Sequence, residues 1–188
     1  YRLVGSEMCI RDRLKREGKK VIGLSSGEPD FDTPQHVKQA AIDAINSGYT
    51  KYTNIEGIPE LRQSIVEKFK KDNDLNYDVS NVIVGTGGKQ ILFNALMSSL
   101  NKDDEVIIPA PYWVSYPDMT LLAGGKPIFV DCSSETNFKL TGEALDKVIT
   151  KNSKWLILNS PSNPTGSCYS ISELEELSLI HISEPTRR

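Results

Sequence analysis

Residues 85–89, which read Gly-Thr-Gly-Gly-Lys, can bind a phosphate group. They stand between a short apolar run and a predicted helix. Glycines let the backbone approach a ligand closely, and the start of a helix offers free N–H groups and the positive end of the helix dipole. The segment matches neither the Walker A loop nor the dinucleotide-binding fingerprint. A tight turn without a ligand explains the glycines equally well.

Two further segments supply an aromatic ring and a side-chain amide. Trp113 follows the next predicted strand, where its indole can stack on a flat ligand or simply pack in the core. Asn163 lies in a loop, residues 159–166, that contains two X-Pro bonds, either of which can be cis. Its amide can donate to a ligand oxygen or form an Asx turn before Pro164. With Gly27, which also ends an apolar run, these residues indicate a pocket for a planar, phosphorylated ligand.

Alternating strands and helices must position these segments. Short apolar runs predict strands over residues 82–84, 105–108, 127–130 and 155–158, and the intervening segments predict helices over 89–100, 112–123 and 142–149. Ser170 and Glu173 have the spacing of a capping box that opens a last helix. Two earlier helices are expected, one capped by Thr33 and closed by Gly48, the other beginning near Pro59. Such alternation is typical of a largely parallel sheet with helices on its faces.

The bulk composition excludes several classes of protein. A net charge of −3 over 188 residues gives no overall field that favours nucleic acid. No apolar run is long enough to span a bilayer, and the N-terminal residues show no apolar core of a signal peptide. The 3 cysteines and 2 histidines show neither disulfide nor metal-ligand spacing, which predicts a reducing compartment and no metal site. A basic cluster near the N-terminus is interpreted as a solvated helix face: Arg11, Arg13, Lys15, Arg16, Lys19 and Lys20.

Several segments, taken in order, resemble the class I aminotransferases of the fold-type I group of pyridoxal 5'-phosphate (PLP) enzymes, and most of all their bacterial aspartate aminotransferase branch. The resemblance covers roughly residues 14–177 and rests on these segments: 23–31, 51–53 with 57–62, 85–90, 109–117 and 159–166. It implies a three-layer α/β sandwich with a mostly parallel sheet, the large domain of that fold, present here incompletely.

The resemblance also implies roles for single residues. The backbone N–H groups of Gly87, Gly88 and Lys89 would hold the PLP phosphate, Trp113 would stack on the pyridine ring, and Asn163 would hydrogen-bond its phenolic oxygen. Tyr52 would reach the phosphate of the neighbouring subunit, which implies a homodimer with shared sites. Gly27, with Trp113 and Asn163, would border the substrate α-carboxylate. In the family the loop at 159–166 carries cis bonds.

The implied reaction is the transfer of an amino group from an amino acid, aspartate in this branch, to a 2-oxo acid, here 2-oxoglutarate, in the cytoplasm. Two alternatives remain open. One is an aromatic or prephenate aminotransferase of the same branch. The other is a catalytically inactive module that binds PLP or another phosphorylated ligand, or that dimerises.

The resemblance does not extend to every part of the site or of the chain. The family's Schiff-base lysine follows the loop at 159–166, beyond the end of this sequence, and Lys89 is no substitute because it belongs to the phosphate loop. We therefore assign no catalytic residue and expect an N-terminal fragment that is inactive alone. The expected division is a non-native or disordered end at 1–13, a small-domain segment at 14–46, a partial PLP-binding large domain at 47–177 and a non-native end at 178–188.

Overall fold

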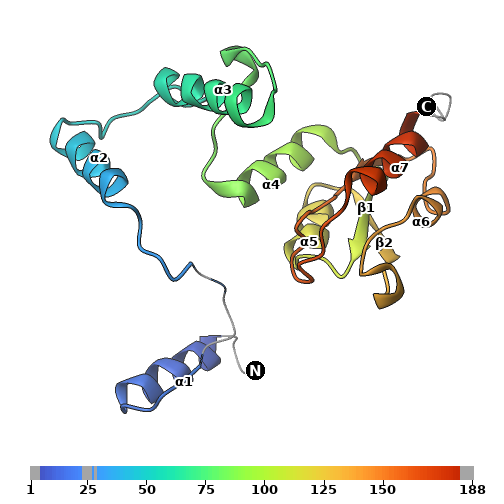
Figure 1. Ribbon diagram of the computed structural model, residues 1–188, viewed down its shortest axis with the longest axis horizontal. Helices are drawn as coiled ribbons and strands as arrows, with labels where there is room; N and C mark the ends of the chain where they lie inside the picture. Colours follow the sequence, from blue (N-terminus) through green and yellow to red (C-terminus); the bar gives the residue numbers. More distant parts are fainter. Residues whose placement is uncertain (1–4, 23–26, 28, 183–188) are drawn as a thin grey trace. The chain divides into compact units, whose positions relative to one another are not determined.

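The computed structural model describes residues 5–22, 27 and 29–182, and its internal contacts divide the chain into two units, Tyr1–Thr53 and Asn54–Arg188. The first contains helices α1 (Gly5–Arg16) and α2 (Gln35–Asn46), which Figure 1 shows in blue. The described part of the predicted N-terminal end, residues 5–13, is helical. The domain assignments made from the sequence stay predictions.

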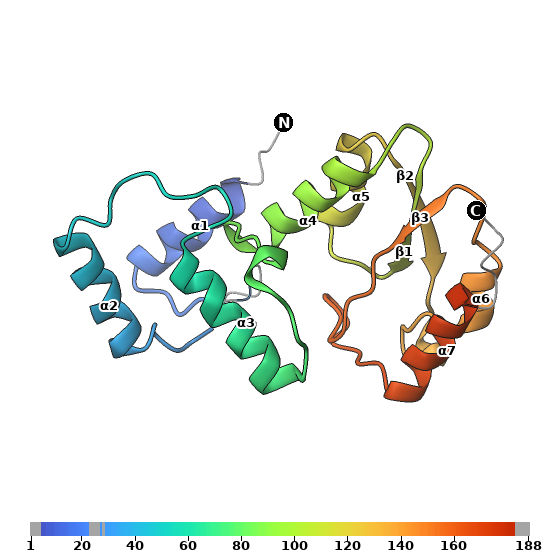
Figure 2. The ribbon, with the colours of Figure 1, turned by 90° about the horizontal axis from the view of Figure 1, so that it is seen from above.

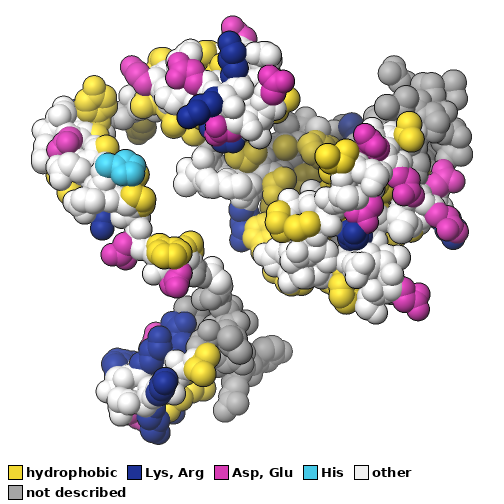
Figure 3. All heavy atoms as spheres, viewed as in Figure 1, with side chains coloured by type: hydrophobic (Ala, Val, Ile, Leu, Met, Phe, Trp, Pro, Cys, Tyr) yellow, Lys and Arg dark blue, Asp and Glu magenta, His cyan; other side chains and the backbone are white. Residues whose placement is uncertain are grey.

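Helix α1 presents a basic surface. Its last turn contains Arg13, Lys15 and Arg16, all exposed, and dark-blue side chains gather over this helix in Figure 3. Lys19 follows the helix and pairs with Glu17 at 3.3 Å. These charges therefore lie on a solvated surface, as the spacing of the basic residues predicts.

Helix α2 confirms one expected boundary and corrects the other. Gly48 ends it with φ +80°, a conformation that favours glycine, and Tyr49 N–H donates to the Ala44 carbonyl at 3.0 Å. The predicted cap at Thr33 is wrong, because Pro34 occupies the N-cap position with ψ 143° and no side chain caps the helix. Pro34 therefore precedes the helix instead of forming its first residue. The apolar run that precedes Gly27, residues 21–24, lies partly outside the described residues.

The second unit contains the sheet and most of the helices. In chain order its elements are α3 (Pro59–Asn73), η1 (Val79–Asn81), α4 (Gly87–Ser99), β1 (Glu105–Ala110), α5 (Ser115–Leu122), β2 (Lys126–Asp131), η2 (Ser134–Thr136), α6 (Gly142–Asp146), β3 (Ser153–Leu156) and α7 (Ile171–Ile182). Pro59 is the first residue of α3, as predicted, and suits that position because its missing N–H needs no partner there. No helix in the described ranges is long and apolar enough to cross a membrane.

The three strands form a parallel sheet in the order β2-β1-β3, with β1 in the centre. Side chains of β1 alternate between its two faces. Val106 and Ile108, both 0% exposed, join a core cluster with Leu96 of α4 and Met119 of α5. Ile107 joins a second cluster, whose other members come from β2, α6, α7 and nearby loops: Val130, Cys132, Leu140, Leu145 and Leu177.

The sheet therefore has helices on both faces, and this confirms the predicted three-layer α/β arrangement. Figure 2 shows α4 and α5 to one side of the strands and α6 and α7 to the other. The strands expected at 105–108 and 127–130 are confirmed as β1 and β2, and the helix expected at 89–100 is confirmed as α4. Two glycines, Gly124 and Gly125, follow α5, and Gly124 has φ +85°.

Four predicted elements differ from the structure. Residues 82–84 form no strand, because their backbone bonds elsewhere: Val84 N–H donates to the Glu56 carbonyl at 2.9 Å, and Arg62 Nε donates to the Val82 carbonyl at 2.9 Å. Helix α5 begins at Ser115 instead of 112, α6 ends at Asp146 instead of 149, and β3 covers 153–156 instead of 155–158. The pairing of Glu105 with Ser153 explains the earlier start of β3.

Candidate functional site

The glycine loop, residues 85–89, leads into the N-terminus of α4. Gly87 has φ +81°, a left-handed conformation that L side chains rarely adopt, and its N–H donates to the Gly85 carbonyl at 3.0 Å. Thr86 N–H donates to the side-chain oxygen of Gln90 one turn into the helix. The N–H groups of Gly88 and Lys89 stand in the first helical turn, where an α-helix has no partners of its own for them.

The space around this loop suits a ligand. A Cβ atom built at Gly87 or at Gly88 would meet nothing within 4 Å, and residues 86–90 are all exposed. Free N–H groups, the helix dipole and an adjacent lysine together form a typical anion site. The donor set present therefore fits a phosphate group.

Trp113 lies next to the glycine loop. Lys89 Nζ lies 4.8 Å from the centre of the Trp113 ring, which is the geometry of a cation–π contact. The indole also meets the buried ring of Tyr116 edge-on, with 5.5 Å between ring centres, and packs against the core cluster around β1. The packing interpretation is confirmed, because Trp113 is half-buried against the core cluster. Its role as a ring that stacks on a ligand stays a prediction.

The Asn-Pro loop, residues 159–166, follows β3. Its Ser160-Pro161 and Asn163-Pro164 bonds are both cis, as expected from the sequence, and so is Ala110-Pro111. Asn163 N–H donates to the Asn159 side-chain oxygen at 2.9 Å, so this bond closes the turn through the side chain of Asn159 and not through that of Asn163. The side chain of Asn163 remains exposed.

A small hollow of about 20 Å³ lies between the carboxyl end of β1 and the Asn-Pro loop. Its walls include Pro111 and Tyr112 from one segment and Asn159, Ser162 and Asn163 from the other. Tyr112 also stacks on Phe129 of β2, with 5.2 Å between ring centres. The hollow places Asn163 close to Pro111 and Tyr112, the neighbours of Trp113, so these two of the segments from which the sequence indicates a pocket do meet.

The predicted site residues therefore fall into two groups. The structure brings Lys89 to Trp113, and it brings the loop of Asn163 to the segment that contains Trp113. Gly27 and Tyr52 are exposed and belong to the first unit. Their predicted roles stay predictions.

The sequence did not single out two tyrosines as candidate site residues. Tyr112 and Tyr169 both line the hollow beside Asn163. Burial raises the pKa of Tyr169 above its ordinary value, so its phenol is neutral at neutral pH. An aromatic residue shortly after a rigid loop is a weak sequence signal, because nothing local shows where its ring points. Within the described residues no group of histidine, cysteine or acidic side chains could hold a metal ion.

Comparison with known proteins identifies relatives of the chain. The sequence model of the family described as "Aminotransferase class I and II" matches residues 19–181. The chain is 60% identical over 172 residues to a Rickettsia bellii protein named "Probable aspartate/prephenate aminotransferase", covering 92% of this chain and 43% of that protein. The chain thus spans less than half the length of this relative.

Solved structures agree with the sequence relatives. The aspartate aminotransferase of Rhizobium meliloti superposes with a TM-score of 0.87 and 49% identity, over 98% of this chain and 46% of that one. The Thermus thermophilus aspartate aminotransferase with maleate superposes with a TM-score of 0.88 and 43% identity, over 95% of this chain and 47% of that one.

Proposed function

The chain belongs to the class I and II aminotransferase family, and from that membership we propose that it forms part of a PLP-dependent aminotransferase. The observation that carries the proposal is the contact of Lys89 Nζ with the Trp113 ring, 4.8 Å away, at the open N-terminus of α4. A site for PLP needs an anion-binding group beside a flat apolar surface, and these elements supply both.

The glycine loop would hold the phosphate of the cofactor. The N–H groups of Gly88 and Lys89 are oriented by the helix, while Gly87, whose N–H already bonds Gly85, permits the left-handed turn that opens the site. If Gly87 N–H is to bind phosphate as well, its bond to Gly85 must lengthen or be shared. The ammonium group of Lys89 adds positive charge at the same place.

Trp113 and Asn163 would orient the cofactor ring. The indole offers a flat, half-buried face for the pyridine ring, and the exposed amide of Asn163 can donate to the phenolic oxygen. When bound, PLP supplies an electron sink for the bonds at the α-carbon of an amino acid. Gly27 would border the substrate α-carboxylate together with these two residues.

Tyr52 would complete the phosphate site of a second copy of the protein, so the complete enzyme would be a homodimer. Its side chain is fully exposed, which leaves the phenol free to reach a partner. No residue of this chain is proposed as the Schiff-base lysine, because Lys89 belongs to the phosphate loop. The complete protein would act in the cytoplasm.

Aspartate and 2-oxoglutarate are the proposed substrates. A second candidate, prephenate as amino acceptor, is favoured by the name of the Rickettsia bellii relative, which includes both activities. The full-length protein that contains this chain should be assayed with aspartate as donor and either 2-oxoglutarate or prephenate as acceptor.

The proposal requires that the full-length protein bind PLP stoichiometrically and transfer nitrogen to at least one of these acceptors. Trp113→Leu should weaken PLP binding by about fivefold, because loss of a stacking contact is worth on the order of 1 kcal/mol. Phe69→Leu is the matched control, since Phe69 is a half-buried aromatic residue of α3 whose ring meets Tyr77. Stoichiometric PLP binding without any transfer would favour the non-catalytic module instead.

A further inference from the structure

The Asn-Pro loop cannot be positioned by its own hydrogen bonds. Gly166 N–H donates to the Ser162 carbonyl at 2.8 Å, and Asn163 N–H donates to the Asn159 side chain at 2.9 Å. These bonds close the turn on itself, and no residue of the loop belongs to a helix or strand. The place of Asn163 therefore depends on contacts with residues outside the loop.

Those contacts come from the four residues that follow, 167–170, which we call the strap. Tyr169 N–H donates to Ser160 Oγ at 3.1 Å, and the Ser167 carbonyl accepts from Ser162 N–H at 2.9 Å. The ring of Tyr169 also lines the hollow that Asn163 borders. The strap thus holds the loop at both of its cis-proline segments.

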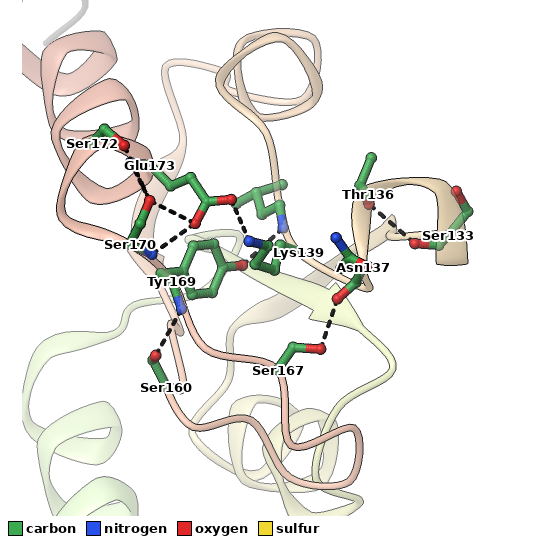
Figure 4. A network of polar contacts seen from close by, with 11 residues as sticks. Ser133, Thr136, Asn137, Lys139, Ser160, Ser167, Tyr169, Ser170, Ser172 and Glu173 are labelled. Carbon is green, nitrogen blue, oxygen red and sulfur yellow. Dashed lines mark hydrogen bonds and ion pairs between the residues drawn. The ribbon is translucent and has the colours of Figure 1, made fainter.

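The strap is tied in turn to residues 137–140, which follow η2. Leu140 N–H donates to the Tyr169 phenol oxygen at 2.8 Å, and Ser167 Oγ donates to the Asn137 carbonyl at 2.7 Å. Figure 4 shows these contacts with the ion pair of Lys139 and Glu173 beside them, where the side chain of Lys139 is only 17% exposed. Tyr169 and Ser167 both bond in two directions, to the loop on one side and to residues 137–140 on the other. Of the two, Tyr169 also lines the hollow that Asn163 borders.

We propose that Tyr169 is a positioning residue that holds the Asn-Pro loop where the amide of Asn163 meets the phenolic oxygen of the cofactor. The phenol fixes the ring against residues 137–140, the ring supports the loop from below the hollow, and the backbone N–H fixes Ser160. This inference rests on the proposed function, because it assigns Tyr169 a part in cofactor binding through Asn163.

The test uses Tyr169→Phe in the full-length protein, with two readouts. Phenylalanine keeps the ring and removes the oxygen that accepts from Leu140 N–H. Hydrogen exchange of the peptide that contains residues 159–166 should become roughly tenfold faster, the effect of losing about one hydrogen bond. The pH midpoint of the absorbance of bound PLP should move in the same direction as in Asn163→Ala, and by a smaller amount.

Two further variants separate positioning from general loosening. Tyr77→Phe makes the same chemical change at a half-exposed tyrosine that packs on Phe69 of α3, and it should change neither readout. Ser160→Ala removes only the acceptor of Tyr169 N–H and should move both readouts in the direction of Tyr169→Phe. It also keeps the test decisive if the tyrosine variant does not fold.

Each outcome bears on one claim. If Tyr169→Phe and Ser160→Ala leave the PLP midpoint at the wild-type value while Asn163→Ala shifts it, the positioning role is overturned and the proposed function stands. If the wild-type protein takes up no PLP, the proposed function fails, and hydrogen exchange still reports whether Tyr169 holds the loop.

Discussion

The two loops of the candidate site are built in opposite ways. The glycine loop is held by its immediate neighbours, through the bonds of Gly87 to Gly85 and of Thr86 to Gln90. The Asn-Pro loop is held by residues distant in sequence, since Ser167 and Tyr169 tie it to residues 137–140. The glycine loop presents backbone N–H groups from the end of a helix, and the Asn-Pro loop presents the side chain of Asn163.

This difference follows from what each loop has to offer a ligand. Helix geometry alone aims N–H groups along the axis of α4, so a phosphate site needs little beyond the helix and flexible glycines. An asparagine amide has no such built-in direction, and its backbone must be fixed by outside contacts before it can orient a ring. Substitutions at local and at distant contacts should therefore affect the two loops unequally.

A substitution in the core beneath both loops should destabilise the two loops equally. Ile108→Ala removes a side chain of β1 that is 0% exposed and packs in the core cluster between the sheet, α4 and α5. It should destabilise the full-length protein by about 2–5 kcal/mol in urea unfolding, through lost burial and a residual cavity. Ile83→Ala is the control, because Ile83 is 64% exposed and should cost no more than about 0.5 kcal/mol.

A change in the glycine loop should depend on backbone conformation alone. Gly87→Ala places a Cβ on a residue with φ +81° and should cost about 1–2 kcal/mol in the same unfolding measurement. Gly88→Ala is the matched control: its Cβ also meets open space, but it lies in the first helical turn, where alanine gains roughly 0.5–1 kcal/mol. Equal destabilisation by both alanines would contradict the local account of this loop.

A substitution beside the strap should change how the stability of the protein depends on acidic pH. The hydrogen bond from Lys139, then those from Ser170, lower the pKa of Glu173 from 4.5 to about 2. A carboxyl whose pKa is lower in the folded state stabilises it above pH 4.5, and that contribution is lost as the pH falls toward 2. Glu173→Gln should therefore flatten the acid limb of the stability profile, measured by urea unfolding from pH 7 to pH 2.

The control for that measurement is Glu175→Gln, an exposed carboxyl on the same helix, which should leave the acid limb close to wild type. Loss of the Lys139 contact should also speed hydrogen exchange in the strap more than in the glycine loop. If both loops responded equally, the Asn-Pro loop would not depend specifically on this network.

The smallest change is expected at the contact between Lys89 and Trp113. An exposed cation–π pair contributes about 0.5–1 kcal/mol, so Lys89→Met and Trp113→Leu should show a coupling energy of that size in a double-mutant cycle. Lys102→Met with Trp113→Leu is the control cycle, because Lys102 is an exposed lysine after α4. Zero coupling in the first cycle would mean that Lys89 does not rest on the indole in solution.

Local patterns predicted much of this fold. Ser170 and Glu173 make the capping box expected from their spacing: Ser170 N–H donates to Glu173 Oε2 at 2.7 Å, and Glu173 N–H donates to Ser170 Oγ at 3.3 Å. Thr141 caps α6 in the same local way, by accepting from Ala144 N–H at 3.2 Å. Such features depend on residues within one helical turn, so their residue types and spacing suffice.

The features that the sequence did not predict correctly depend on contacts between residues that are distant in sequence. The apolar run at 82–84 has the composition of a strand, but the side chain of Arg62 and the backbone of Glu56 take its hydrogen bonds. The spacing of residues says nothing about such partners. For the same reason the ring of Tyr169 could not be placed beside Asn163 before the fold was known.

The order of residues along the chain was enough to identify helices, the strands β1 and β2 and the family, because each depends on short-range spacing. Folding in three dimensions settled which face of β1 each helix covers, that residues 82–84 leave the sheet, and that the strap holds the Asn-Pro loop. These outcomes depend on which distant groups bury together and satisfy one another's hydrogen bonds, and no local pattern encodes that choice.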